Sequence, residues 1–294
     1  MFCRCFGDYL LGKNIITQEQ LDYILNYRKI NRVKLGLIAV EQKLLTVAKA
    51  EEINRLQMTK DKRFGDIAIE KGYLNEEEVS KLLNLQGNPY LLFVQAVTEQ
   101  DILSKEKVDA CMIGFQQEHG YSHGEMEALK TGDVEKVVAL LTKAEPPYDE
   151  LVRLVIKNLI RFASTDIAIK TEKKSKEVTM NHLAMQEFQG DYSVMLCLGC
   201  ENEELLAIAN PYAKEEFENL DEDAMDAVCE FINCTNGLYA SKLSQDNIEL
   251  DMLPPSNKDQ VTLTTDREFY ELDIQISGQW IKLVLAIKSQ WSLS

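Results

Sequence analysis

The N-terminal part of the chain contains an internal repeat. Comparing this part with itself gives units that begin at Cys5, Lys34, Arg63 and Leu92, a constant offset of 29 residues. A period of this size is typical of arrays in which each unit is one small supersecondary element that buries its apolar face against its neighbours. The repeat therefore predicts an all-α domain over residues 1–117, built from pairs of short helices.

The third unit, RFGDIAIEKGYLNEEEVSKLLNLQ (residues 63–86), shows the pattern most clearly. Asn75 stands where a second helix should begin, and Glu78 three residues later completes a capping-box arrangement. The first unit has the same arrangement at Thr17 and Gln20. Each unit is thus expected to carry its own helix start signal.

Residues 118–147 interrupt the repeat. They contain several glycines, one helical pattern, and the pair Pro146 and Pro147 at the end. Pro and Gly are the strongest local breakers of regular structure. We interpret this segment as a linker with one helix, followed by a second domain over residues 148–294.

The second domain mixes helical and strand patterns. Residues 148–162 and 221–243 have apolar side chains at helical spacing, whereas 178–188, 191–200 and 203–209 are strand-like. We therefore expect an α+β fold in which long helices pack on an antiparallel sheet.

The C-terminal residues predict a β-hairpin. Apolar and polar side chains alternate over 270–277, Gly278 supplies a turn, and 280–287 is more uniformly apolar. The alternating strand is therefore expected to bury one face only.

The helix predicted over 221–243 has two distinct faces. A rotation of about 100° per residue puts Asp226, Glu230, Asn233 and Gly237 on one line, beside the core stripe. The core stripe itself consists of Met225, Val228, Cys229, Ile232, Tyr239 and Leu243. Glu230 and Asn233 are therefore expected to point the same way from an exposed flank, one turn apart.

An exposed Glu and Asn at this spacing have limited chemistry of their own. Glu230 can pair with a lysine, and the Asn233 amide can donate and accept hydrogen bonds, so together they can hold a water. They lack the adjacent base that makes a nucleophile and have too few ligands for a metal site. On spacing alone, an ordinary solvated helix face is the more frequent explanation.

The wider pattern resembles the CheC/CheX/FliY family of chemotaxis phosphatases. Asp226, Glu230 and Asn233 are followed about twenty residues later by Pro254, and the GDYSVMLCL strand, the LPPS turn and the closing hairpin fit the same family. Members with two active centres carry a second Glu-x-x-Asn motif on their first long helix. Here Val155 stands three residues before Asn158, at the position where that motif needs Glu. The chain is therefore similar to the single-motif CheX type.

The resemblance implies an activity and a partner. The helix would insert beside the aspartyl phosphate of a phosphorylated CheY-like receiver, where Glu230 would pair with the receiver's lysine and Asn233 would orient the attacking water. Asp226, Gly237 and Pro254 would contact the partner. The resemblance also implies a homodimer formed through the sheet, for which the alternating strand at 270–277 would offer an edge. The chain would need no cofactor of its own, since Mg²⁺ would stay on the receiver. The alternative is a non-catalytic adaptor that binds a receiver or serves as a scaffold.

The repeat resembles a second family, the MshEN-type domain of secretion and pilus ATPases, whose paired motifs can bind cyclic di-GMP. The matching residues are Arg63, Gly65, Gly72 and Gln86, and these four, with Lys34 of the preceding unit, are the possible nucleotide-binding residues. Lys34 and Lys43 replace the Arg and Gly of the motif in that unit. The alternative is a helical interaction or spacer module that keeps the packing residues without binding a nucleotide.

Charge and cysteine usage limit the partners and the location. The net charge of −16 opposes binding to nucleic acid polymers, and residues 191–260 hold sixteen Asp or Glu against three Lys. No apolar run is long enough for membrane insertion. Seven Cys suggest reduced thiols in the cytoplasm, and Cys197 and Cys200, without a second pair, are interpreted as buried free thiols.

Overall fold

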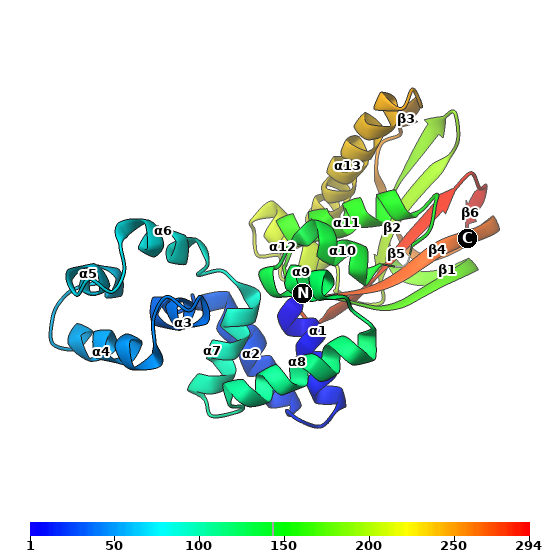
Figure 1. Ribbon diagram of the computed structural model, residues 1–294. Coiled ribbons are helices and arrows are strands. Elements are labelled where there is room, and N and C mark those ends of the chain that lie inside the picture. Colours follow the sequence, from blue (N-terminus) through cyan, green and yellow to red (C-terminus); the bar gives the residue numbers. More distant parts are fainter. Residues whose placement is uncertain (143) are drawn as a thin grey trace. The chain divides into compact units, whose positions relative to one another are not determined.

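The computed structural model describes residues 1–142 and 144–294, which form two compact units (Figure 1). One unit comprises Phe2–Asp133 and the other comprises Val134–Ser294 together with Met1. The first is all-α and the second combines helices with a sheet, so the chain is α+β as expected.

The first unit contains nine helices within its described residues. They are α1 (Phe2–Gly12), α2 (Gln18–Ile30), α3 (Leu35–Glu41), α4 (Val47–Gln57), α5 (Phe64–Glu70), α6 (Glu76–Asn84), α7 (Pro89–Glu99), α8 (Lys105–His119) and α9 (His123–Thr131). The first eight form four successive pairs, which confirms the helix pairs predicted from the repeat.

The turn inside each pair keeps the 29-residue offset. Asn14, Lys43, Gly72 and Asp101 all have positive φ angles, of 56°, 57°, 67° and 50°. This left-handed conformation favours glycine, yet only one of the four is Gly. The backbone shape of the repeat is therefore retained where its glycine signal has been lost.

The second helix of each pair begins with the same cap. Thr17, Thr46, Asn75 and Ser104 each accept a hydrogen bond from the backbone N–H three residues later. In the first and third units the capping box is complete, as predicted. These local bonds fix where the helices start in every unit.

The segment 118–147 differs from the expected linker with one helix. Its described residues contain two complete helices, α9 and α10 (Val134–Leu141), and the boundary of the two units falls between Asp133 and Val134. Gly132 ends α9 in the left-handed conformation, with a φ of 74°. This terminating glycine divides what the sequence suggested was a single helical stretch.

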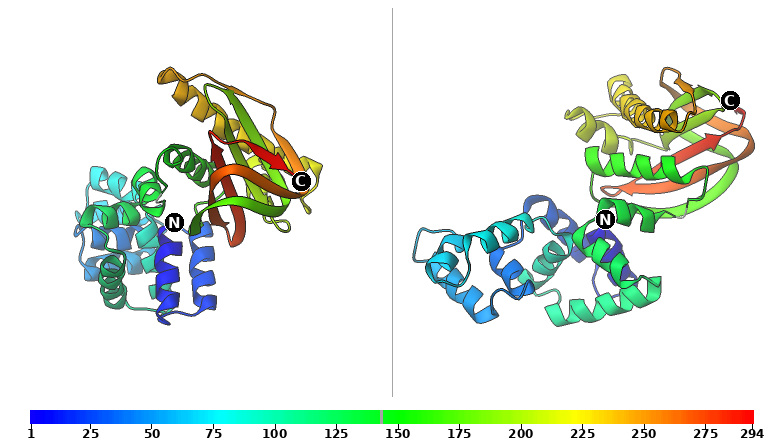
Figure 2. Two further views of the ribbon diagram at one scale, coloured as in Figure 1. Left: turned by 90° about the vertical axis from the view of Figure 1, so that its right-hand side faces the viewer. Right: turned by 45° about the horizontal axis from the view of Figure 1, so that its top comes forward.

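The second unit packs helices on an antiparallel sheet (Figure 2). Its elements after α10 are α11 (Asp149–Phe162), β1 (Ile167–Gly190), β2 (Val194–Cys200), α12 (Leu206–Ala213), α13 (Glu222–Gln245), β3 (Leu250–Met252), β4 (Ser256–Ile276), β5 (Gln279–Ile287) and β6 (Trp291–Leu293). The two long helices and the closing hairpin agree with the prediction.

The strands close into a ring of pairings. The sheet order is β3-β1-β2-β5-β4-β6, and β1 pairs with β4 as well, so β1, β2, β5 and β4 each have a partner on both sides. Inside lie apolar side chains from all four strands: Val178, Met180, Leu183, Met185, Met195, Cys197, Val261, Leu263, Phe269, Val284 and Ala286.

Two strand predictions were wrong. Residues 203–209 do not form a strand, because Leu205, Ile208 and Ala209 are buried at helical spacing and belong to the start of α12. The alternating strand 270–277 is no sheet edge, because residues 270–276 pair with β1 on one side and β5 on the other. It therefore has no free backbone groups to offer to a second copy of the chain.

Candidate functional site

The helix α13 carries the predicted site. Asp221 caps its N-terminus by accepting a hydrogen bond from the Ala224 N–H at 3.0 Å. The predicted core stripe is buried throughout: Met225, Val228, Cys229, Ile232, Tyr239 and Leu243. This burial fixes the rotation of the helix and hence which way its remaining side chains point.

The motif residues lie beside that stripe. Asp226 and Glu230 are exposed, whereas Asn233 and Gly237 are half-buried. Asn233, predicted on the exposed flank of the helix, is thus only partly exposed, and its side chain sits where α13 meets the sheet. Glu230 and Asn233 still form a line one turn apart, as predicted.

A chain of amides holds Asn233. Gln186, on β1, is 2% exposed and donates one Nε2 hydrogen to Asn233 Oδ1 at 2.8 Å and another to the Leu253 carbonyl at 2.8 Å. Its Oε1 accepts from Asn236 Nδ2 at 2.9 Å. The structure thus brings together the Asn of the motif and the residue that precedes Pro254.

Gln186 and Asn236 were not predicted from the sequence, although both leave a signal there. Asn236 lies four residues after Ile232 and three before Tyr239, in the middle of the core stripe. Gln186 stands between Ala184 and Phe188, which are buried on the same side of β1. A polar residue at such a position is expected to have a buried partner.

Tyr212 supports the backbone behind Glu230. Its hydroxyl donates to the Glu230 carbonyl at 3.3 Å, and its ring meets the Phe231 and Phe162 rings edge-on at 5.7 Å. Burial raises the pKa of Tyr212, so the phenol keeps the proton that it donates. Glu230 is therefore presented from a well-packed turn of the helix.

Cys229, the residue before Glu230, does not supply a reactive thiolate. Burial, with smaller contributions from the Asp226 and Glu230 carboxylates, raises the pKa of Cys229 to about 11. A thiol with this pKa is almost entirely protonated at neutral pH and is a weak nucleophile. The chemistry of the motif therefore rests on the carboxylate and the amide, which are suited to holding a cation and a water.

The first long helix presents no second motif to a partner at the corresponding position. Val155 is fully buried, and Asn158 is 4% exposed with its Nδ2 donating to Thr235 Oγ1 at 3.0 Å. Asn158 therefore joins α11 to α13 inside the unit.

The remaining motif positions mark the ends of the site. A Cβ added at Gly237 would lie 3.9 Å from Met252 Cε, so this glycine adjoins β3 and the turn that follows. Pro254 is exposed in that turn. Asp226 lies one turn before Glu230, toward the start of the helix.

The residues suggested for nucleotide binding lie in the first unit, and most have structural roles. A Cβ on Gly65 would come within 2.8 Å of Val79 Cγ1, and Gly72 needs its positive φ. The Gln86 amide donates to the Val33 carbonyl at 3.0 Å, and Lys34 pairs with Glu99 at 2.6 Å. Arg63 is exposed just before α5. This geometry favours the packing interpretation of the motif.

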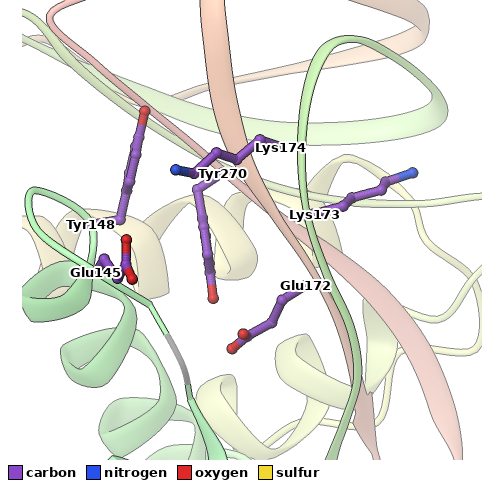
Figure 3. A pocket seen from close by; sticks show the side chains of 6 residues that line it. All are labelled: Glu145, Tyr148, Glu172, Lys173, Lys174 and Tyr270. Carbon is purple, nitrogen blue, oxygen red and sulfur yellow. The ribbon is translucent and has the colours of Figure 1, made fainter.

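A hollow and a pair of cysteines in the second unit are formed by residues outside the motif. A hollow of about 380 Å³ is lined by Glu145, Tyr148, Glu172, Lys173, Lys174 and Tyr270 (Figure 3). The Tyr148 and Tyr270 rings stack there at 5.5 Å. Cys197 and Cys200 are free and buried, as interpreted from the sequence.

The described residues contain neither a metal cluster nor a membrane span. Within 1–142 and 144–294, no group of three or more His, Cys, Asp or Glu is placed to hold a metal ion. Over the same ranges, no helix is both long enough and apolar enough to cross a lipid bilayer.

A comparison with models of protein families gives a match that includes the helix α13. Residues 182–274 match the model of the family described as chemotaxis phosphatase CheX. We call this stretch the CheX region. It runs from β1 to β4 and contains Gln186, Glu230, Asn233 and Pro254. It does not extend into the first unit, so the resemblance of the repeat to MshEN-type domains stays a prediction.

Solved CheX structures are similar to this chain at low identity. CheX of Desulfovibrio desulfuricans is 14% identical over 48% of this chain and 97% of that one, with a TM-score of 0.42. CheX of Vibrio vulnificus is 14% identical over 47% and 95%, with a TM-score of 0.40. The CheX–CheY–BeF3–Mg²⁺ complex of Borrelia burgdorferi contains a chain 15% identical over 49% and 99%, with a TM-score of 0.40. The comparison with curated proteins gives no match.

Proposed function

We propose that this chain hydrolyses the aspartyl phosphate of a CheY-like response regulator in chemotaxis or another two-component pathway. The observation that carries the proposal is the pairing, within the CheX region, of an exposed Glu230 with an Asn233 whose amide is held by the protein. A fixed amide beside an exposed carboxylate is the arrangement that this chemistry needs from a phosphatase helix.

The two side chains have different tasks. Glu230, on the surface, would pair with the lysine of the receiver's phosphorylation site. Asn233 would hold a water in line with the phosphorus–oxygen bond to the aspartyl carboxylate, which leaves as the water's oxygen bonds to phosphorus. Most of the rate gain would come from positioning, since neither side chain forms a covalent bond with the phosphoryl group.

The receiver would supply the remaining parts. Its Mg²⁺ would stay bound during the reaction, and its lysine would complete the charge pattern around the phosphoryl group. The acidic character of residues 191–260 favours a partner whose docking surface is basic. The active centre would therefore exist only in the complex of the two proteins.

The test is the Asn233→Ala variant of the full chain. Loss of phosphate from a receiver labelled with acetyl phosphate should slow by about 100-fold relative to wild type. The fold should survive, because the variant removes one of two acceptors of Gln186 Nε2, a cost of about 1 kcal/mol in the free energy of unfolding.

A matched control comes from the same helix. Ser244→Ala, at an exposed position near the end of α13, should leave both dephosphorylation and stability unchanged. An Asn233→Ala protein that is as fast as wild type would contradict the proposed hydrolysis. Receiver binding without any acceleration by the wild-type protein would instead favour the non-catalytic adaptor.

Several expectations beyond this activity stay predictions. They are a homodimer formed through the second unit, a cytoplasmic location, and cyclic di-GMP binding by the first unit. The alternating strand at 270–276 is not available as the dimer edge, so any dimer would use another surface.

A further inference from the structure

Gln186 is a buried polar side chain in the contact between β1 and α13. It lies on β1 between Ala184 and Phe188, faces α13, and is 2% exposed. A methionine or leucine would fill such a place without the cost of burying an amide. The hydrogen bonds that Gln186 makes therefore point to a role beyond packing.

Chemistry fixes the orientation of this amide. The Leu253 carbonyl can only accept a hydrogen bond, so the Gln186 atom that lies 2.8 Å from it must be the nitrogen Nε2. The same nitrogen lies 2.8 Å from Asn233, which must therefore present its oxygen Oδ1. The Leu253 carbonyl thus sets, through Gln186, which way the Asn233 amide faces.

We propose that Gln186 is the positioning residue of Asn233 and that the Leu253 carbonyl sets its orientation. This inference rests on the proposed function. With one lone pair of Oδ1 engaged by Gln186, Asn233 keeps its other lone pair and both Nδ2 hydrogens for the water and the phosphoryl group. Without Gln186, the amide could rotate, and the water would lose its fixed site.

The proline of the motif acquires a structural task in this arrangement. Proline restricts the residue before it to extended backbone, so Pro254 limits the directions that the Leu253 carbonyl can take. Leu253 is also fixed to β1, because its N–H donates to the Glu187 carbonyl at 2.9 Å. Pro254 would therefore act on Asn233 from inside the protein, in addition to any contact with the partner.

Asn236 adds an independent observation. It is fully buried and donates to Gln186 Oε1, but its own Oδ1 is a buried atom without a hydrogen bond among the described residues. Such an atom lowers stability and is rare in native proteins. The hydrogen-bonded amides of Gln186 and Asn236 therefore lower stability, as is expected of buried polar groups that serve a function.

The first test compares rate with stability in the full chain. The double variant Gln186→Met, Asn236→Leu replaces the buried amides with apolar side chains of similar size. The free energy of unfolding should stay the same or rise, because Asn233 and Leu253 are half-exposed and can bond to water instead. The kcat for receiver dephosphorylation should fall at least about tenfold, with KM for the receiver unchanged.

The second test uses pH. In Gln186→Glu, burial should raise the pKa of the new carboxyl above its ordinary value of about 4.3. The protonated form keeps one O–H donor, whereas the ionised form can only accept and would turn the Asn233 amide around. The kcat of this variant should fall as pH rises through that pKa. The wild type also has Glu230 one turn from Asn233 but has no carboxyl at position 186. Its kcat should therefore not fall over the same pH range.

The third test measures hydrogen exchange and does not depend on phosphatase activity. In the wild type, the Gln186 side-chain N–H protons should exchange with solvent much more slowly than those of Gln189, an exposed glutamine three residues along β1. The Gln186 protons should stay protected in Asn233→Asp, whose side chain still offers acceptor oxygens. They should exchange faster in Asn233→Ala, whose side chain offers no acceptor. The Gln186→Met variant assigns the signal, because the signal should be absent from it.

The outcomes separate the two ideas. Unprotected Gln186 protons, or a double variant with unchanged kcat, would overturn the positioning role. A wild-type protein that dephosphorylates no receiver would remove the proposed function, and the exchange measurement would still decide whether Gln186 holds the Asn233 amide.

Discussion

Asn233 differs from an ordinary surface asparagine because only part of its side chain faces solvent. Its Oδ1 is bound to Gln186, whereas Glu230 one turn earlier is exposed. A rigid amide suits the placing of a water, and an exposed carboxylate suits the capture of a lysine on an incoming partner. The same helix face thus carries one fixed and one adaptable group.

Gly237 gives a prediction at the residue scale in which stability and binding change in opposite directions. Gly237→Ala should raise the free energy of unfolding by about 0.5–1 kcal/mol, since Gly weakens a helix interior and the new methyl meets only Met252 Cε at an ordinary 3.9 Å. Urea unfolding measures this gain. If the receiver packs on Gly237, KM for the receiver should rise.

The control reverses the substitution nearby. Ala240→Gly on the same helix should lose a similar stability and leave KM unchanged. An equal KM for Gly237→Ala and wild type would show that the receiver does not contact this position.

The helix pair is the element that builds the first unit. In the third pair, α5 crosses α6 so closely that Gly65 leaves no room for a side chain beside Val79. The cap at Asn75 and the left-handed Gly72 fix the turn between the two helices. The cap and the left-handed turn recur at the same positions of the other pairs, although the residues there differ.

Gly65→Ala tests this packing at the element scale. The added Cβ would lie 2.8 Å from Val79 Cγ1, so the variant should lose about 1–3 kcal/mol in the free energy of unfolding of the first unit. Adding Val79→Ala should restore most of the loss. Thermal or urea unfolding of the single and double variants gives the comparison.

Gly124→Ala is the matched control, because nothing lies within 4 Å of a Cβ added in α9. It should be neutral or slightly stabilising. A Gly65→Ala protein as stable as this control would mean that the helices of the pair can move apart at little cost.

At the scale of the whole molecule, the proposed activity belongs to one of two compact units. Residues 134–294 contain α13, the whole sheet and a core drawn from four strands. A unit with its own core is expected to fold independently. The first unit would then act on the activity or its location without taking part in the chemistry.

A fragment of residues 134–294 tests this division. It should unfold in a single cooperative urea transition and dephosphorylate the receiver with a kcat/KM similar to that of the full chain. A folded fragment with much lower activity would show that the first unit contributes to the reaction, and an unfolded one would contradict the independence of the two units.

The sequence by itself determined what depends on neighbours in the chain. The helix starts at Thr17 and Asn75, the 29-residue period, and the buried and exposed faces of α13 all arise from bonds or contacts within a few turns. The pairing of Glu230 with Asn233 on one line belongs to the same class. Local physics of this kind leaves a periodic signal in the order of the residues.

The tertiary structure decided what depends on residues far apart in the chain. Gln186 reaches Asn233 and Leu253, 47 and 67 residues away, only because β1 lies beside both α13 and the turn before β4. The interior position of strand 270–276 likewise follows from its pairing with β1, about 100 residues earlier in the chain. The burial of Gln186 leaves a local pattern, but the identity of its partners and of the partners of strand 270–276 does not, because the way the sheet closes decides it.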